Sequence, residues 1–161
     1  QQSKELLNMA KYVEQRIVIT QDWNIAIVKA SFNSDITDLL EESCRTKLSE
    51  LGVSNVKTYT VPGAFELPLV SKAVASKETI DAVIVIGAVI RGGTPHFEYV
   101  CNGVTNGITS VNLEIQKPVI FGVLTLDTKQ QALDRCGGKD GNKGEEFAVA
   151  CLSTLEVLKS I

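Results

Sequence analysis

The residues best suited to chemistry lie where a long apolar run ends in two glycines. Residues 80–103 read IDAVIVIGAVIRGGTPHFEYVCNG, and His96, the only histidine in the chain, follows directly after the GGTP tetrapeptide. Thr94 is a good N-cap residue and Pro95 suits the first position of a helix. The N–H groups at a helix N-terminus form an anion site, and the positive end of the helix dipole favours a neutral imidazole. The stretch predicts a proton shuttle beside a phosphate-sized anion, although a tight turn with His96 on its surface explains it equally well.

A second unusual stretch, RCGGKDGNKGEE at 135–146, combines four glycines with three cations. Arg135 offers a planar fork for phosphate, and Lys143 offers a point charge. The alternative is a helix-to-helix loop whose charges are simply solvated, which is the commoner fate of any one lysine.

Aromatic and acidic side chains follow two other apolar stretches. In VPGAFELPL (61–69), Phe65 and Glu66 begin a predicted helix, where Glu66 either favours the helix dipole or accepts hydrogen bonds from a polyol. Phe32 and Phe121 lie at or near predicted strand ends, and each either stacks on a planar heterocycle or packs in the core.

Several classes of function are disfavoured by what the sequence lacks. The G-x-G-x-x-G dinucleotide fingerprint is absent, and no Ser–His–Asp arrangement or catalytic carboxylate pair stands out. The four cysteines are scattered without C-x-x-C spacing, so we expect small core residues in a reducing compartment and no metal site. A net charge of −3 disfavours nucleic acid and anionic membranes as partners. No apolar run approaches the roughly 20 residues that span a bilayer.

The elements that must position these residues alternate between strand and helix patterns. Predicted strands, rich in β-branched residues and mostly unalternating, cover 24–32, 55–61, 81–90 and 118–126. Predicted helices cover 34–51, 63–77, 95–115, 128–136 and 142–160. The alternation indicates a parallel sheet with right-handed crossovers and helices on both faces, in which ligands bind beyond the carboxyl ends of the strands. The candidate residues follow those ends.

The beginning of the chain is predicted separately. EQRIVIT at 14–20 looks like an extra strand, which pairs either with this chain's own sheet or with a neighbour's edge. We expect a single domain over 1–161, with 1–13 as a flexible segment. The chain starts at Gln1 without an apolar signal core, so we expect a trimmed N-terminus and a cytoplasmic protein, or a plastid protein if a transit peptide was removed.

Five segments together resemble a known family. ASFN, VPGAFELP, GAVIRGGTPHFEYV, PVIFGVLT and DRCGGKDGNKG occur in the order and spacing of the 6,7-dimethyl-8-ribityllumazine synthase family, from about residue 24 to about residue 150. The resemblance implies a flavodoxin-like α/β protein, a three-layer α/β/α sandwich around a four-stranded parallel sheet. It also implies that the extra N-terminal strand pairs with a neighbouring subunit.

The resemblance implies a specific reaction. This is the condensation of 5-amino-6-(D-ribitylamino)uracil with 3,4-dihydroxy-2-butanone 4-phosphate to the lumazine, phosphate and water, the penultimate step of riboflavin biosynthesis. No cofactor or metal is expected. The expected proton donor and acceptor is His96. The expected substrate-binding residues are Phe32, Ala64, Phe65, Glu66, Ala88, Val89, Ile90, Gly93, Thr94, Phe121, Arg135 and Lys143.

Within that set, Phe32 is expected to stack on the pyrimidine, and Arg135 to bind phosphate together with Gly93 and Thr94. Family sites form between neighbouring subunits, so Phe121 is expected to come from an adjacent chain. The expected partners are further copies of this chain, in a pentamer or a sixty-subunit capsid, and riboflavin synthase. The rival hypotheses are a non-catalytic lumazine or flavin carrier, a shell-forming protein on the same scaffold, and a generic nucleotide-binding module.

Overall fold

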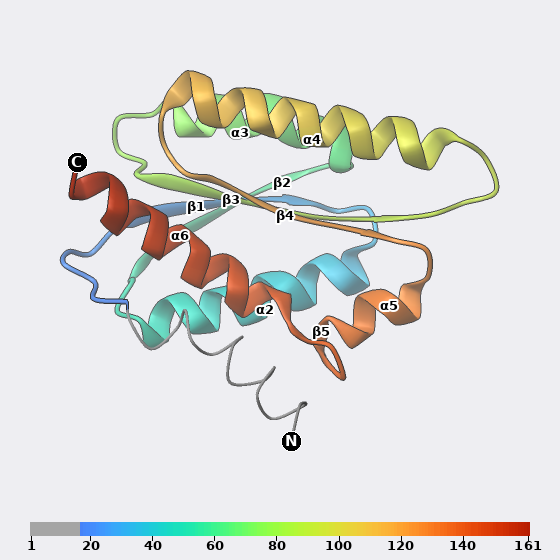
Figure 1. Cartoon of the computed structure of the whole chain (residues 1–161), viewed down its shortest axis with the longest axis horizontal. Coiled ribbons are helices and arrows are strands. Elements are labelled where there is room, and N and C mark those ends of the chain that lie inside the picture. The colour runs from blue at the N-terminus through green and yellow to red at the C-terminus, as the bar shows by residue number, and fades with distance from the viewer. Residues whose placement is uncertain (1–16) are drawn as a thin grey trace.

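Four parallel strands in the order β2-β1-β3-β4 form the sheet at the centre of the structure, a computed structural model that describes residues 17–161 (Figure 1). The strands are β1 (Asn24–Ala30), β2 (Asn55–Val61), β3 (Ala82–Ile90) and β4 (Val119–Leu126), with a small hairpin of β5 (Cys136–Gly138) and β6 (Gly141–Asn142). The helices are α2 (Ser34–Glu50), the 3-10 helix η2 (Ala64–Glu66), α3 (Leu67–Ala75), α4 (His96–Ile115), α5 (Lys129–Asp134) and α6 (Lys143–Lys159).

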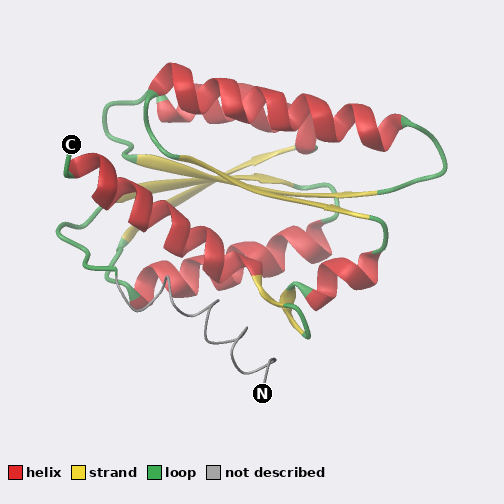
Figure 2. Ribbon diagram, viewed as in Figure 1, coloured by secondary structure: helices red, strands yellow, loops and turns green. Residues whose placement is uncertain are grey.

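Helices cover both faces of this sheet, as the strand and helix pattern predicts. Figure 2 shows α3 and α4 on one face and α2 and α6 on the other, with α5 and the hairpin on the side of α2 and α6. Each face has its own core of buried side chains, one under α2 and α6 and one under α3 and α4. The central strand β3 is buried from Ala82 to Ala88, which explains why its sequence is apolar without alternation. The predicted three-layer α/β/α fold is confirmed.

Two local predictions about helices have different outcomes. The helix predicted over 34–51 is confirmed as α2, which ends there because Gly52 adopts a left-handed conformation at φ +92° directly after the C-cap residue Leu51. The single helix predicted over 63–77 is wrong in detail, since η2 precedes α3 there. Pro68 lies in the first turn of α3, a position where proline is tolerated and favours a new helix start.

The predicted strand at 14–20 is not paired with the chain's own sheet in the part that the structure describes. Residues 17–20 have no regular secondary structure, and 14–16 lie outside the described residues, as does the segment 1–13. Thr20 instead binds α6, where its backbone N–H and its hydroxyl donate to the carboxylate of Glu156 at 2.9 Å each. Pairing with a neighbouring subunit stays a prediction.

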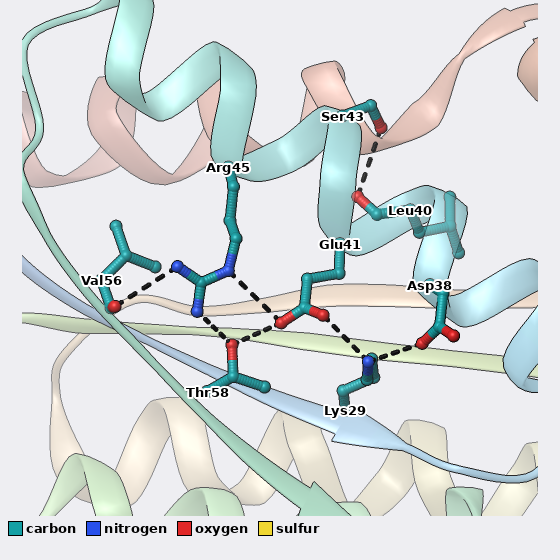
Figure 3. A network of polar contacts seen from close by, with 8 residues as sticks. All are labelled: Lys29, Asp38, Leu40, Glu41, Ser43, Arg45, Val56 and Thr58. Carbon is teal, nitrogen blue, oxygen red and sulfur yellow. Dashed lines mark hydrogen bonds and ion pairs between the residues drawn. The ribbon is translucent and has the colours of Figure 1, made fainter.

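A polar network fixes α2 on the two strands at the β2 edge of the sheet (Figure 3). Lys29 of β1 donates to Asp38 at 2.6 Å and to Glu41 at 2.9 Å. Thr58 of the edge strand β2 donates to Glu41 and accepts from Arg45. The Glu41 carboxylate therefore joins one helix to two strands.

Residues 17–161 contain neither a candidate membrane-spanning helix nor a candidate metal-binding cluster. No helix there has the length and apolar character needed to cross a membrane. Nor does that part of the chain gather three or more His, Cys, Asp or Glu side chains in a way that would suit a metal ion.

Candidate active site

A cleft of about 690 Å³ opens at the carboxyl end of the sheet, on the α3 and α4 face. It lies between the ends of β1 and β3, the 3-10 helix η2 and the first turns of α4. Its lining includes most of the residues predicted from the sequence: Phe32, Ala64, Phe65, Glu66, Ala88, Val89, Ile90, Thr94 and His96. The structure thus gathers side chains from four separate segments at the place where parallel sheets bind ligands.

The segment that carries Phe32 is held by main-chain and side-chain hydrogen bonds. The N–H of Phe32 donates to the carbonyl of Pro62 at 3.0 Å, which extends the β1–β2 ladder past its last strand residues. Asn33 follows in a left-handed conformation at φ 59°, and its Nδ2 donates to the carbonyl of Ala88 at 2.8 Å. The Phe32 ring is 71% exposed, so this backbone frame, and not core packing, determines where the ring lies.

The end of β3 presents main-chain polar groups to the cleft. β1 pairs with β3 only as far as Lys29 opposite Ile86, whereas β4 pairs with it up to Ile90 opposite Leu126. The last residues of β3 therefore have no strand on the β1 side, where the Ala88 carbonyl already accepts from Asn33. Backbone N–H and C=O groups at such a position can bind the polar edge of a heterocycle.

The turn that leads to His96 is fixed mainly by Arg91. The backbone N–H of Arg91 donates to the Leu126 carbonyl at 2.8 Å, and its Nε donates to Asp127 at 2.8 Å. Its guanidinium also pairs with Glu98 and lies 4.4 Å from the centre of the Phe97 ring. The hydrogen bond from Arg91 lowers the pKa of Glu98, which is therefore a carboxylate near neutral pH. The first turn of α4 is in this way tied to the end of β4.

The prediction that Thr94 caps α4 is wrong. The helix begins at His96, and Pro95 is its N-cap residue, whose carbonyl accepts from the N–H of Glu98 at 3.0 Å. No side chain caps the helix, so the Thr94 hydroxyl is available to a ligand. His96 is exposed, and its ring has no hydrogen-bond partner among the described residues. His96 and Phe97 of the first turn of α4 line the cleft, and free N–H groups at a helix N-terminus suit an anion.

The other predicted residues do not line this cleft. Gly93 lies in the turn, but only its neighbours Gly92 and Thr94 reach the cavity. Phe121 is 41% exposed on the edge strand β4, opposite Val85 and therefore well before the cleft end of β3.

The two predicted cations flank the hairpin, since Arg135 is the C-cap residue of α5 and Lys143 is the first residue of α6. The hairpin lies on the side of the α2 and α6 layer (Figure 1). Arg135 donates to the Gln131 carbonyl at 2.9 Å, and Lys143 pairs with Glu146 at 3.1 Å. No Lys or Arg among residues 17–161 lines the cleft, whose titratable lining residues are Glu66, His96 and Tyr99.

Comparison with known proteins identifies the family. The model of the 6,7-dimethyl-8-ribityllumazine synthase family matches residues 22–159. A 6,7-dimethyl-8-ribityllumazine synthase of Parabacteroides distasonis is 49% identical over 148 residues, which cover 90% of this chain and 92% of that protein. The chain belongs to the 6,7-dimethyl-8-ribityllumazine synthase family. The resemblance found in the sequence is thereby confirmed.

Sequence reasoning missed several lining residues of this lumazine synthase family cleft. Gly63 and Gly92 line it beside predicted residues, and Phe97, Tyr99 and Val100 line it from α4. Tyr99 and Val100 follow His96 by three and four positions, and residues at that spacing share one face of a helix. Helical periodicity counted from His96 was the signal that would have found these two.

Proposed function

We propose that this protein catalyses the condensation of 5-amino-6-(D-ribitylamino)uracil with 3,4-dihydroxy-2-butanone 4-phosphate to 6,7-dimethyl-8-ribityllumazine, in the penultimate step of riboflavin biosynthesis. The observation that carries the proposal is the family match over residues 22–159. The cleft supports it, because His96, two exposed phenylalanines and open main chain lie together at one end of the sheet.

Each group in the cleft has a role in this proposal. Phe32 stacks on the pyrimidine, while Ala64–Glu66 and Ala88–Ile90 bind the ring and the ribityl chain. Gly93 and Thr94, with the first N–H groups of α4, bind the phosphate of the second substrate. The Glu66 carboxylate is suited to accept hydrogen bonds from ribityl hydroxyls.

The chemistry needs proton transfer and close placement of two substrates. The amine of the uracil attacks the ketone, and loss of water gives a Schiff base. Phosphate then leaves, the resulting enol tautomerises, and the second nitrogen closes the ring with loss of another water. His96 donates and accepts the protons of these steps, and holding both substrates in one cleft supplies much of the acceleration.

We infer that a neighbouring copy completes the cleft, with Phe121 as a lid over the heterocycle and with Arg135 and Lys143 as cations. The support is that none of the three lines the chain's own cleft, and that the cleft has no cation of its own among residues 17–161. A pentamer, or a sixty-subunit capsid of pentamers, provides such a neighbour. The unpaired segment 17–20 fits the extra strand expected to pair with the neighbour.

The proposed location of the protein is the cytoplasm or a plastid. The cysteines are all free, which fits the reducing cytoplasm, or a plastid if a transit peptide was removed. Riboflavin synthase is the proposed partner, because it consumes the lumazine.

The proposal is tested by mixing the two substrates with the protein and following lumazine fluorescence. We expect His96→Ala to retain activity but to lose on the order of 10²-fold in kcat. Arg135→Ala should mainly raise KM for the phosphorylated substrate, with Lys139→Ala in the same loop as its control. A protein that binds the lumazine but forms none would be a carrier, and the proposal would be wrong.

A mixing experiment tests whether neighbours share the site. His96→Ala and Arg135→Ala chains are purified separately, unfolded, mixed in equal amounts and refolded together. If Arg135 acts in a neighbour's cleft, about one site in four regains both residues in a randomly mixed ring, and activity returns accordingly. Activity no higher than the mean of the two separately refolded variants would place Arg135 in its own chain's site or in none.

A further inference from the structure

Gly103 in the middle of α4 lies directly against the ring of Phe65. A Cβ atom at Gly103 would be 2.6 Å from Cε2 of Phe65 and 3.3 Å from its Cδ2. Non-bonded carbon atoms normally approach to about 3.5–4.0 Å. The ring thus occupies the space that any other residue at position 103 would fill.

Backbone conformation does not explain this glycine. Gly103 is not among the described residues with positive φ, and it lies in the interior of a 20-residue helix. Among helix-interior residues, glycine is the least favourable apart from proline. The space it leaves for Phe65 is therefore the reason we find for its presence.

Core packing does not explain the contact either. The Phe65 side chain is 63% exposed and lines the cleft, so its contact with Gly103 buries little of it from water. Gly107, one turn further along α4, differs in this respect, because a Cβ there would be 2.6 Å from Cγ of the half-buried Pro68. Gly107 allows α3 to pack on α4, whereas Gly103 makes room for a side chain of the cleft wall.

We propose that Gly103 is a positioning residue: it leaves room for the Phe65 ring to lie against α4, and so keeps the cleft wide enough for the flat heterocycle. The inference rests on the proposed function only in naming the heterocycle. An alanine at position 103 forces the ring away by about 1 Å. The ring then moves into the cleft or into solvent, because α4 blocks the other side. A displacement of that size in a binding wall lowers affinity or rate by about tenfold.

The test separates binding from stability. Gly103→Ala is expected to raise KM for the ribitylaminouracil and Kd for 6,7-dimethyl-8-ribityllumazine by about tenfold. KM for the butanone phosphate and the melting temperature should not be impaired, since the exposed ring moves freely and alanine favours the helix. Gly107→Ala is the matched control: it should lower the melting temperature, because the proline ring cannot turn aside, and leave Kd unchanged.

A double-mutant cycle with Phe65→Ala shows whether Gly103 acts through the ring. In the Phe65→Ala background, Gly103→Ala should have no further effect on Kd. An unchanged Kd in Gly103→Ala, an equal effect in both backgrounds, or a loss of stability like that of Gly107→Ala would each overturn the proposal. Because the lumazine titration needs no turnover, it still shows whether Gly103 shapes the cleft in a protein without synthase activity.

Discussion

Removal of the charge from Glu41 tests the network that holds α2 to the edge of the sheet (Figure 3). The Glu41 side chain is 18% exposed and accepts hydrogen bonds from Lys29, Thr58 and Arg45. Glu41→Gln keeps the size of the side chain but removes the negative charge. One of the two carboxylate oxygens is replaced by an NH2 group, which cannot accept a hydrogen bond from Lys29 at Oε1 or, in the other orientation, from Thr58 and Arg45 at Oε2.

The expected loss follows from the burial of the partners. In Glu41→Gln the Lys29 side chain, which is 13% exposed, still has its ion pair with Asp38. Because the Asp38 side chain is 63% exposed, solvent screens that ion pair and weakens it. Hydrogen bonds to charged groups contribute about 1.5–3 kcal/mol each, of which the amide retains a part. We expect Glu41→Gln to lower the free energy of unfolding by about 2 kcal/mol. For a chain of this size that is a fall of roughly 4–8 °C in melting temperature.

The pH dependence gives a second, independent check. Burial acts to raise the pKa of Glu41, but hydrogen bonds from Thr58 and Lys29 outweigh it and hold the pKa below its usual value of 4.5. A carboxyl with a depressed folded pKa contributes stability above its unfolded pKa and loses it as pH falls through the folded pKa. The stability difference between wild type and Glu41→Gln should therefore be constant from about pH 7 to pH 5.5 and shrink below pH 4.5.

Thermal unfolding is followed by circular dichroism at one fixed protein concentration, because assembly makes melting temperatures concentration-dependent. Glu42→Gln is the control, since Glu42 is adjacent, exposed and without a partner among the described residues. A Glu41→Gln melting temperature within a degree of that of the control at pH 7, or a difference that persists undiminished in acid, would refute the reasoning.

Three shorter predictions concern other contacts. Gly122→Ala should lower the free energy of unfolding by about 2–3 kcal/mol in denaturant titration, because the new Cβ would lie 2.4 Å from a backbone oxygen of β3. Asn33→Gly keeps the left-handed backbone but loses the bond to the Ala88 carbonyl, so KM for the ribitylaminouracil should rise while Asn33→Ala also loses stability. Cys44 and Cys151 should react with a thiol reagent only after unfolding, because burial raises the pKa of both and brings that of Cys44 to about 12.

The strands and helices were predictable because burial leaves a direct mark on sequence. The apolar run of β3 has no polar alternation, since helices cover both faces of the strand. Leu40, Cys44 and Leu48 recur at helical spacing because that stripe of α2 faces the core. The position of the cleft was predictable from topology, since the order of strands and helices fixes where the carboxyl ends of the strands meet.

The details that failed depend on contacts between distant segments. The start of α4 is a local exception: Thr94 and Pro95 both suit the start of a helix, and the observed helix begins at His96 with no side-chain cap. A glycine inside a helical pattern does not indicate which residue packs against it. The contact of Gly103 with Phe65 depends on how η2 packs on α4, which the sequence does not show.

Charge decides which part of the proposed reaction depends on assembly. A helix N-terminus supplies roughly half a positive charge, whereas a phosphate monoester carries about −1.5 to −2 near neutral pH. The α4 N-terminus is thus insufficient, and the Glu66 carboxylate in the same cleft opposes the anion. In the proposal the heterocycle is held mainly by stacking and main-chain hydrogen bonds, which one chain offers through Phe32 and the end of β3, and a neighbour adds only the Phe121 ring. Under the proposal that a neighbour's Arg135 binds the phosphate, dissociation of the assembly should weaken binding of the phosphorylated substrate far more than binding of the uracil.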